Sequence, residues 1–234
     1  MLLRGLLLAS LVATPRLDAQ LNGVPVWPVG LPVPNAPPLD LIAAVHTTSG
    51  DDFVNLATEA DAGVTLGMDY ALGPRLTLRG LLGAIHRDVA LGQRRTEFQG
   101  AALIGVNLIQ EYLASGENEV GASVLGGYGY GTLPDGGENN LVVGLDFTTV
   151  IGMGGWFIEQ AFVPRWSFRH TRVASGGDWQ HGPAISGATT LGFPFGLRLA
   201  ITAERVFLGA GDASPPGLPQ TRTYAWSVAV RYRF

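Results

Sequence analysis

The C-terminal stretch Thr221–Phe234, TRTYAWSVAVRYRF, alternates between two kinds of side chain. The even positions are apolar or aromatic: Tyr224, Trp226, Val228, Val230, Tyr232 and Phe234. The odd positions from Thr223 to Arg233 are small, polar or charged. Because successive side chains of a strand point to opposite faces, the stretch predicts a strand with one apolar and one polar face. Aromatic residues stand at both ends of the apolar face, which is the arrangement of a strand that crosses a bilayer.

The end of this strand carries a resemblance to a known family. A closing alternating strand that ends in Tyr232-x-Phe234 resembles the C-terminal strand of bacterial outer-membrane β-barrel proteins. The resemblance covers residues 221–234 only. It implies that Tyr232 and Phe234 form the signal read by the barrel-assembly machinery. The expected partners are therefore this machinery and the lipids of the outer membrane.

The same alternation recurs along the chain from Leu39 onward. It is found in Leu39–His46, Glu59–Leu72, Arg75–Arg87, Glu97–Leu108, Glu119–Tyr130, Asn140–Ile151, Trp156–His170, Ala184–Phe193 and Gly196–Glu204. With the last strand, these are about ten segments of roughly ten residues, as tilted membrane strands require. We therefore predict an all-β chain that forms a closed antiparallel transmembrane β-barrel of about ten strands, with eight as the alternative number.

The connections predict which ends of the strands lie together. Short turns are expected at Gly73-Pro74, Gly152–Gly155 and Pro194–Gly196. Longer polar loops are expected at Asp51–Thr58, Asp88–Thr96, Leu133–Asn139, Thr171–His181 and Leu208–Gln220, with Gln110–Asn118 as a longish connection on the short-turn side. Short turns on one side and long loops on the other are typical of outer-membrane barrels. An even number of strands would place both termini in the periplasm.

The composition agrees with a membrane barrel. Hydrophobic residues make up 47% of the chain and charged residues only 15%, which is apolar for a soluble protein. No run of about 18 apolar residues follows the amino terminus, so no membrane-spanning helix is expected. The chain has no cysteine, so it has no disulfide framework. The net charge of −4 gives no reason to expect a nucleic-acid partner.

The amino-terminal residues divide into two segments that precede the barrel. Residues 1–19 have Arg4, an apolar run and a small residue at Ala19, which predicts a signal peptide. Residues 20–38 hold six prolines and predict an extended periplasmic linker. The barrel is then expected over residues 39–234.

The polar face of the predicted strands carries charges of both signs. A turn centred on Pro74 would place Asp69 opposite Arg79, Asp61 opposite Arg87, and Tyr70 opposite Leu78. The charges expected inside the barrel are Asp61, Asp69, Arg79, Arg87, Glu159, Arg165, Arg198, Glu204 and Arg231. A barrel of this size is largely filled by its own side chains. A closed ion-paired core and a narrow channel both remain open, and a soluble barrel would instead turn the apolar face inward.

Histidines and aspartates near the predicted loops are weak candidates for catalysis at the rim of the barrel. They are His86, Asp88, His170, Asp178 and His181. A ten-stranded barrel with rim Asp and His resembles the omptin proteases, although His86-Arg87-Asp88 reverses the family's Asp-x-His order. The segment Arg169–Arg172 is distantly similar to the His-x-Ser element of lipid A deacylases, with Arg172 in place of the serine. No metal or cofactor site is expected.

These observations lead to three hypotheses about function. The first is an outer-membrane barrel without catalytic activity, either a structural or surface protein or a narrow passive, porin-like channel. The second is a hydrolase of the outer membrane with its active site at the rim, acting as a protease or a lipid A deacylase. The third is a secreted soluble barrel that binds a ligand.

Overall fold

Ten strands make up the part of the chain that the computed structural model describes, which is residues 39–49, 61–73, 75–89, 93–112, 118–133, 136–173, 176–208 and 221–234. The strands are β1 Leu39–Ser49, β2 Asp61–Ala71, β3 Leu76–Val89, β4 Gln93–Tyr112, β5 Asn118–Leu133, β6 Gly136–Met153, β7 Trp156–Val173, β8 Gly176–Gly192, β9 Leu197–Leu208 and β10 Thr221–Arg233. The predicted signal peptide and linker lie outside these residues. Among the described residues, no helix is long and apolar enough to cross a membrane.

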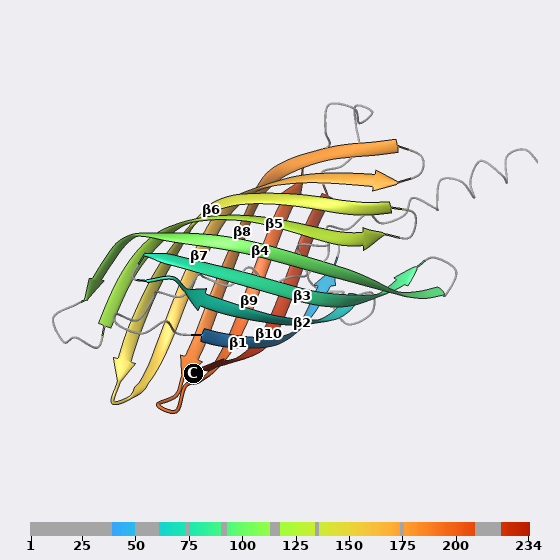
Figure 1. Ribbon diagram of the computed structural model, residues 1–234. Helices are drawn as coiled ribbons and strands as arrows, with labels where there is room; N and C mark the ends of the chain where they lie inside the picture. The colour runs from blue at the N-terminus through green and yellow to red at the C-terminus, as the bar shows by residue number, and fades with distance from the viewer. Residues whose placement is uncertain are drawn as a thin grey trace, which may run out of the picture.

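The ten strands form a closed cylinder. Each strand pairs antiparallel with its neighbours in the chain, and β1 pairs with β10 to close the barrel (Figure 1). At this closure Ala43 lies opposite Val230, and Val45 lies opposite Val228. The prediction of an all-β, closed, ten-stranded antiparallel barrel is confirmed.

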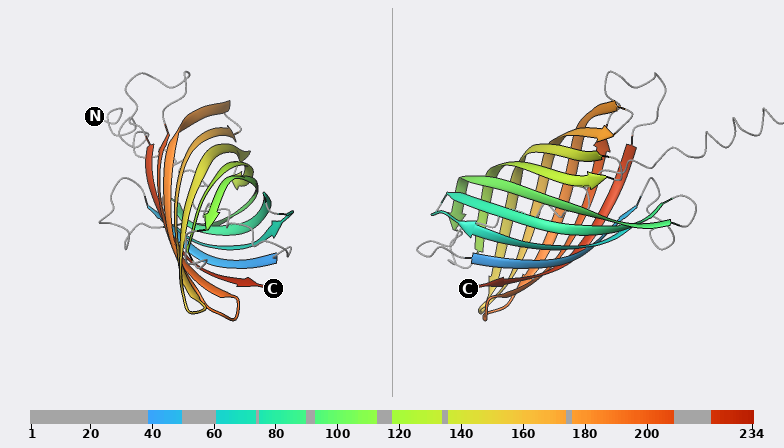
Figure 2. Two further views of the ribbon diagram at one scale, coloured as in Figure 1. Left: turned by 90° about the vertical axis from the view of Figure 1, so that its left-hand side faces the viewer. Right: turned by 45° about the vertical axis from the view of Figure 1, so that its right-hand side comes forward.

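The wall of the barrel is taller on one side. Strands β4, β6 and β7 have 20, 18 and 18 residues, whereas β1 and β2 have 11 each. In the right-hand view of Figure 2, the yellow and orange strands β6 to β8 rise above the blue strand β1 at the end away from the C-terminus. The outer surface of β6 to β8 therefore spans more than the thickness of an apolar bilayer core.

Glycines allow the three short turns that the sequence predicts. Gly73, Gly154, Gly155 and Gly196 have positive φ angles of 110°, 60°, 91° and 86°. Other residues rarely adopt this left-handed region, because their Cβ would contact the backbone. At Gly196 the space is limited as well, since an added Cβ would lie 2.6 Å from the carbonyl oxygen of Arg233.

Three predicted long loops are wrong. β3 continues to Val89 and β4 begins at Gln93, so most of Asp88–Thr96 is strand. Likewise β5 ends at Leu133 and β6 begins at Gly136, and β7 ends at Val173 and β8 begins at Gly176. The upper parts of these strands are rich in glycine and polar residues, such as Arg94 and Arg95 in β4, Gly136 and Gly137 in β6, and Gly176 and Gly177 in β8. Their composition is typical of turns, whereas their backbone pairs as in the rest of the barrel.

The connection predicted at Gln110–Asn118 begins later than expected, because β4 contains a β-bulge. The pairing of β4 with β5 shifts register between Asn107 and Ile109. As a result Leu108 and Ile109, which are adjacent in sequence, are both exposed on the outer face. A bulge reverses the alternation of side chains, and for this reason the sequence pattern ends at Leu108 although the strand reaches Tyr112.

The register predicted around Pro74 is confirmed where it is described. Asp69 lies opposite Arg79, and Tyr70 lies opposite Leu78. The backbone N–H of Leu72 donates to the carbonyl of Leu76 over 2.7 Å. The side chains of Asp61 and Arg87, the other predicted pair, lie outside the described residues.

The apolar face of the strands points outward. In β10, Val228 and Val230 are 52% and 44% exposed, whereas Ala229 and Arg231 are each 1% exposed. The same division holds around the cylinder, where Leu66, Leu82 and Phe98 are exposed. A soluble ligand-binding barrel has the opposite arrangement. The hypothesis of a secreted soluble barrel is therefore contradicted by the orientation of the side chains.

Candidate functional site

The barrel interior is the first candidate site, and its side chains lie in levels. Each of three strands shows the same order from the short-turn end upward. In β1 the inward residues are Asp40, Ile42, Ala44 and His46; in β7 they are Glu159, Ala161, Val163 and Arg165; in β9 they are Arg198, Ala200, Thr202 and Glu204. A charged level is therefore followed by an apolar level and then by a second polar level.

The lower ionic cluster, at the short-turn end, consists of Asp40, Asp69, Arg79, Glu159, Arg198, Arg231 and Arg233. Arg79 donates two hydrogen bonds to Asp69, from Nε over 2.5 Å and from Nη2 over 2.6 Å. Arg231 Nη2 bridges the two acids, at 2.7 Å from Asp69 and 3.0 Å from Asp40. Bidentate geometry of this kind gives the strongest ion pairs in proteins.

Asp40 places this cluster at the closure of the barrel. It belongs to β1 and accepts hydrogen bonds from Arg233 of β10, over 2.8 Å from Nε and 3.1 Å from Nη2. The Nη1 atom of Arg198 in β9 lies 3.9 Å from Asp40 Oδ2 and 3.8 Å from Oε2 of Glu159 in β7. The lower ionic cluster therefore joins the first and last strands and links them to β2, β3, β7 and β9.

The apolar layer lies above this cluster and fills the interior. It consists of Ile42, Ala44, Leu81, Leu103, Leu125, Val142, Val163, Ala200 and Ala229, which pack as one hydrophobic cluster. None of them is more than 5% exposed, and Leu125 is fully buried. Side chains that lined a water-filled lumen would be accessible to water. The apolar layer therefore interrupts the polar interior in the middle of the barrel.

Polar groups return above the apolar layer. Arg165 Nη2 donates to Glu204 Oε1 over 2.5 Å, and its Nη1 donates to Ser186 over 2.7 Å. Further up, Arg169 donates to Gln180 over 2.5 Å and lies 3.7 Å from Glu138. All of these charged side chains are buried. Buried charges are costly unless paired, so the pairs hold β6, β7, β8 and β9 in one arrangement.

The structure places the expected interior charges as follows. Asp69, Arg79, Glu159, Arg165, Arg198, Glu204 and Arg231 are all buried inside the cylinder, and the side chains of Asp61 and Arg87 are not described. The apolar layer was not predicted from the sequence. A signal was present, because Leu81 and Ile85 interrupt the polar face of β3 and Leu103 and Leu125 interrupt those of β4 and β5.

The histidines do not converge on one site. His46 is buried inside the barrel, with Nδ1 3.4 Å from Thr65 Oγ1. His86 is exposed on β3, and its Nδ1 atom lies 3.3 Å from Thr96 Oγ1. His170 and His181 lie on β7 and β8, which β4, β5 and β6 separate from β3. The side chains of Asp88 and Asp178 lie outside the described residues. Among the residues described, no group of His, Cys, Asp and Glu could hold a metal ion.

His170 and His181 belong to an aromatic surface on the outside of the barrel. The ring of His170 stacks on Trp179, with centroids 4.4 Å apart and an interplanar angle of 16°. The centroid of the His181 ring lies 6.0 Å from that of Trp166 and 6.2 Å from that of Phe168. Aromatic and amphipathic rings gather where a barrel crosses the membrane interface. We call the five residues Trp166, Phe168, His170, Trp179 and His181 the upper girdle.

A lower girdle of aromatic residues lies at the short-turn end of β7 to β10. The ring centroids of Trp156 and Phe193 are 4.6 Å apart, and those of Phe193 and Phe195 are 5.5 Å apart. Tyr232 and Phe234 form an edge-to-face pair with centroids 4.9 Å apart. Between the two girdles, the outward side chains of β7 are Ile158, Gln160, Phe162 and Pro164. Paired girdles that flank an apolar band are the mark of a barrel in a bilayer.

Comparison with known proteins identifies the fold. No protein-family model and no curated protein sequence matches this chain. Among solved structures, the β domain of the Bordetella autotransporter BrkA is similar, with a TM-score of 0.51 and 10% identity over 86% of this chain and 100% of that one. LpxR from Salmonella typhimurium has a TM-score of 0.49 and 7% identity over 84% of this chain and 100% of that one.

The outer membrane protease OmpT from Escherichia coli is also similar, with a TM-score of 0.43 and 10% identity over 86% of this chain and 98% of that one. A fold of this kind does not by itself select an activity. The chain has the fold of the bacterial outer-membrane β-barrel proteins.

Proposed function

We propose that the protein resides in the outer membrane as a sealed, non-conducting barrel and acts as a structural or surface protein without catalytic activity. The observation that carries this proposal is the apolar layer, in which nine residues from eight of the ten strands fill the interior and exclude water. Of the two interiors that the sequence left open, this arrangement supports the closed one. A passive channel would need a continuous polar path.

The energetic cost of crossing the apolar layer supports this proposal. An ion that passed Leu81 and Leu125 would have to give up most of its hydration shell between apolar side chains, which is costly in a medium of low dielectric constant. The ionic levels on either side do not lower this barrier, because their charges are already paired with one another. The interior therefore suits rigidity rather than transport.

The outer surface supports the location in the membrane. The exposed aliphatic side chains between the girdles suit contact with lipid acyl chains. Tyr232 and Phe234 are 42% and 72% exposed at the end of β10, where the assembly machinery could reach them. With ten strands, β1 begins and β10 ends at the short-turn end, which we assign to the periplasm.

Conductance in planar bilayers tests the sealed interior. We expect the purified protein to insert without single-channel steps. A variant with Leu103→Ala, Leu125→Ala and Val142→Ala removes side chains from the apolar layer and should allow a measurable leak. The matched control carries Leu141→Ala, Val143→Ala and Leu145→Ala on the outer face and should remain closed. Regular ohmic steps from the unmodified protein would disprove the proposal.

A further inference from the structure

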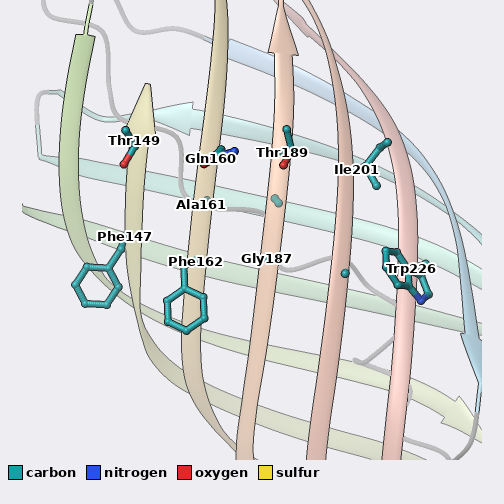
Figure 3. A pocket seen from close by; sticks show the side chains of 11 residues that line it. Phe147, Thr149, Gln160, Ala161, Phe162, Gly187, Thr189, Ile201 and Trp226 are labelled. Atoms are coloured by element: carbon teal, nitrogen blue, oxygen red, sulfur yellow. The ribbon is translucent and has the colours of Figure 1, made fainter. Parts of the chain in front are cut away.

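Three polar side chains interrupt the apolar outer face of the barrel. Thr149 of β6 lies opposite Gln160 of β7, and Gln160 lies opposite Thr189 of β8. All three are exposed and point outward, so they form one continuous polar row across three strands (Figure 3). Within the described part of the chain, none of the three side chains makes a hydrogen bond to another residue.

A shallow hollow lies beside this polar row. The next row of outward residues is Phe147, Phe162, Gly187, Ala203 and Trp226, and successive members lie opposite one another on β6 to β10. The two small residues, Gly187 and Ala203, stand between the large rings of Phe162 and Trp226. The hollow is therefore an apolar depression with a polar edge, on the face that Figure 3 shows from close by.

The polar row lies deep in the apolar band. On β7 it stands between Trp156 of the lower girdle and Trp166 of the upper girdle. At a rise of about 3.3 Å per residue, Gln160 is about 13 Å along the strand from Trp156. With the usual tilt of membrane strands, this is about 10 Å inside the lower girdle. The ester and headgroup oxygens of lipids lie near the girdles, so lipid offers only hydrocarbon at the depth of Gln160.

An amide in hydrocarbon needs a hydrogen-bonding partner. The bilayer core contains no water to supply one, and burying an amide without a partner is unfavourable. The partner must therefore present neutral donors and acceptors about 10 Å inside the girdle, as required by the position of Gln160. A second copy of the same chain meets this requirement, because its own girdles hold its polar row at the same depth.

We propose that two copies of the protein associate side by side through the outer faces of β6, β7 and β8, around a twofold axis along the membrane normal. Such an axis places a residue at the centre of the interface opposite its own copy. The side chain of glutamine carries both a donor and an acceptor, so Gln160 complements Gln160 of the second copy. The hollow at Gly187 and Ala203 lets the two walls approach closely, as small residues do in membrane interfaces.

Cysteine cross-linking in lipid vesicles tests the geometry, because the chain has no native cysteine. With an oxidant, Gln160→Cys should form a disulfide-linked dimer rapidly. Leu82→Cys is the matched control, since Leu82 is 73% exposed on β3, across the barrel from β7. It should cross-link at least tenfold more slowly. Equal rates for the two variants would indicate random collision and would overturn the proposal.

Sedimentation equilibrium in detergent tests the contribution of the amide. Gln160→Leu should weaken dimerisation about tenfold, since an interhelical or interstrand polar contact in a membrane is of this order. Leu82→Gln should not create a dimer of comparable strength. Heat-modifiable gel migration confirms that each variant folds. A monomeric unmodified protein, a dimer that Gln160→Leu leaves intact, or a monomer that retains a phospholipid at this face would each contradict the proposal.

Discussion

The inner and outer walls of this barrel differ in how their polar side chains are satisfied. On the inner wall, Asp69 receives hydrogen bonds from Arg79 and Arg231, and these pairs join strands that are distant in the chain. On the outer wall, Gln160 has no such partner among the described residues. An interior polar group can be paired by the same fold. A polar group that faces lipid must be paired by another molecule, and it therefore indicates an interaction.

The strongest test of this contrast is the removal of an interior charge. Asp40→Ala leaves Arg231 and Arg233 without their common acceptor at the closure between β1 and β10. Breaking a buried pair on one side costs about 3–5 kcal/mol, because the other charge stays buried. We expect this loss in the free energy of unfolding, measured by urea titration in lipid vesicles.

The control for this variant is Glu111→Ala, since Glu111 is an exposed carboxylate on β4. Substitutions at exposed positions change stability by about 0.5 kcal/mol or less. If Asp40→Ala were as harmless as Glu111→Ala, the lower ionic cluster would have no role in holding the barrel closed.

A second pair of variants compares leucines on the two walls. Leu125→Ala removes a fully buried side chain from the apolar layer, and leaving a cavity of this kind costs about 2–5 kcal/mol. Leu145→Ala removes the same atoms from an outer position that is 41% exposed. Lipid can fill the space at Leu145, so its loss should be clearly smaller. Equal losses in vesicle unfolding would mean that the interior is not packed.

A third pair separates backbone conformation from close contact at the turns. Gly73→Ala places an alanine at a φ of 110° with nothing near its Cβ. The left-handed conformation alone costs about 1–2 kcal/mol. Gly196→Ala meets the same strain and also the carbonyl of Arg233 at 2.6 Å. It should be the more destabilising of the two, and the reverse order would contradict the packing of this turn against β10.

The smallest effect is expected in the upper girdle. His170→Ala removes the ring that stacks on Trp179, and such stacking contributes about 0.5–1.5 kcal/mol. We expect a loss of stability in this range, with His170→Phe restoring it. Restoration by phenylalanine indicates a packing role for the ring. A chemical role for the imidazole would instead appear as lost hydrolysis of peptide or lipid substrates in both variants.

The fold could be predicted from the sequence because one face of every strand contacts lipid. This requirement imposes an apolar residue at each alternate position, and the pattern is plain in β10 and β2. The alternation of apolar residues stops where the strands no longer contact lipid acyl chains. At the level of the upper girdle, β8 alternates Trp179 and His181 with Gln180 and Gly182, so the sequence resembles a loop although the backbone pairs with β7.

The interior could be predicted only in part. Charges at alternate positions indicated a polar inner face, and the local register fixed the pairing of Asp69 with Arg79. The contacts of Asp40 with Arg231 and Arg233 required knowledge that β1 closes on β10, because these residues are far apart in the chain. The polar row on the outer face was also missed, since Gln160 and Thr189 become neighbours only through the pairing of β7 with β8.

The most direct test of the account uses two adjacent residues of β10. Val228→Cys and Ala229→Cys each introduce the single thiol of the chain, and a fluorophore on each can be quenched by brominated lipid acyl chains. Val228 is 52% exposed on the outer face, whereas Ala229 is 1% exposed in the interior. We predict strong quenching at position 228 and little at position 229. Stronger quenching at 229, or none at either site, would contradict a barrel whose apolar face contacts lipid.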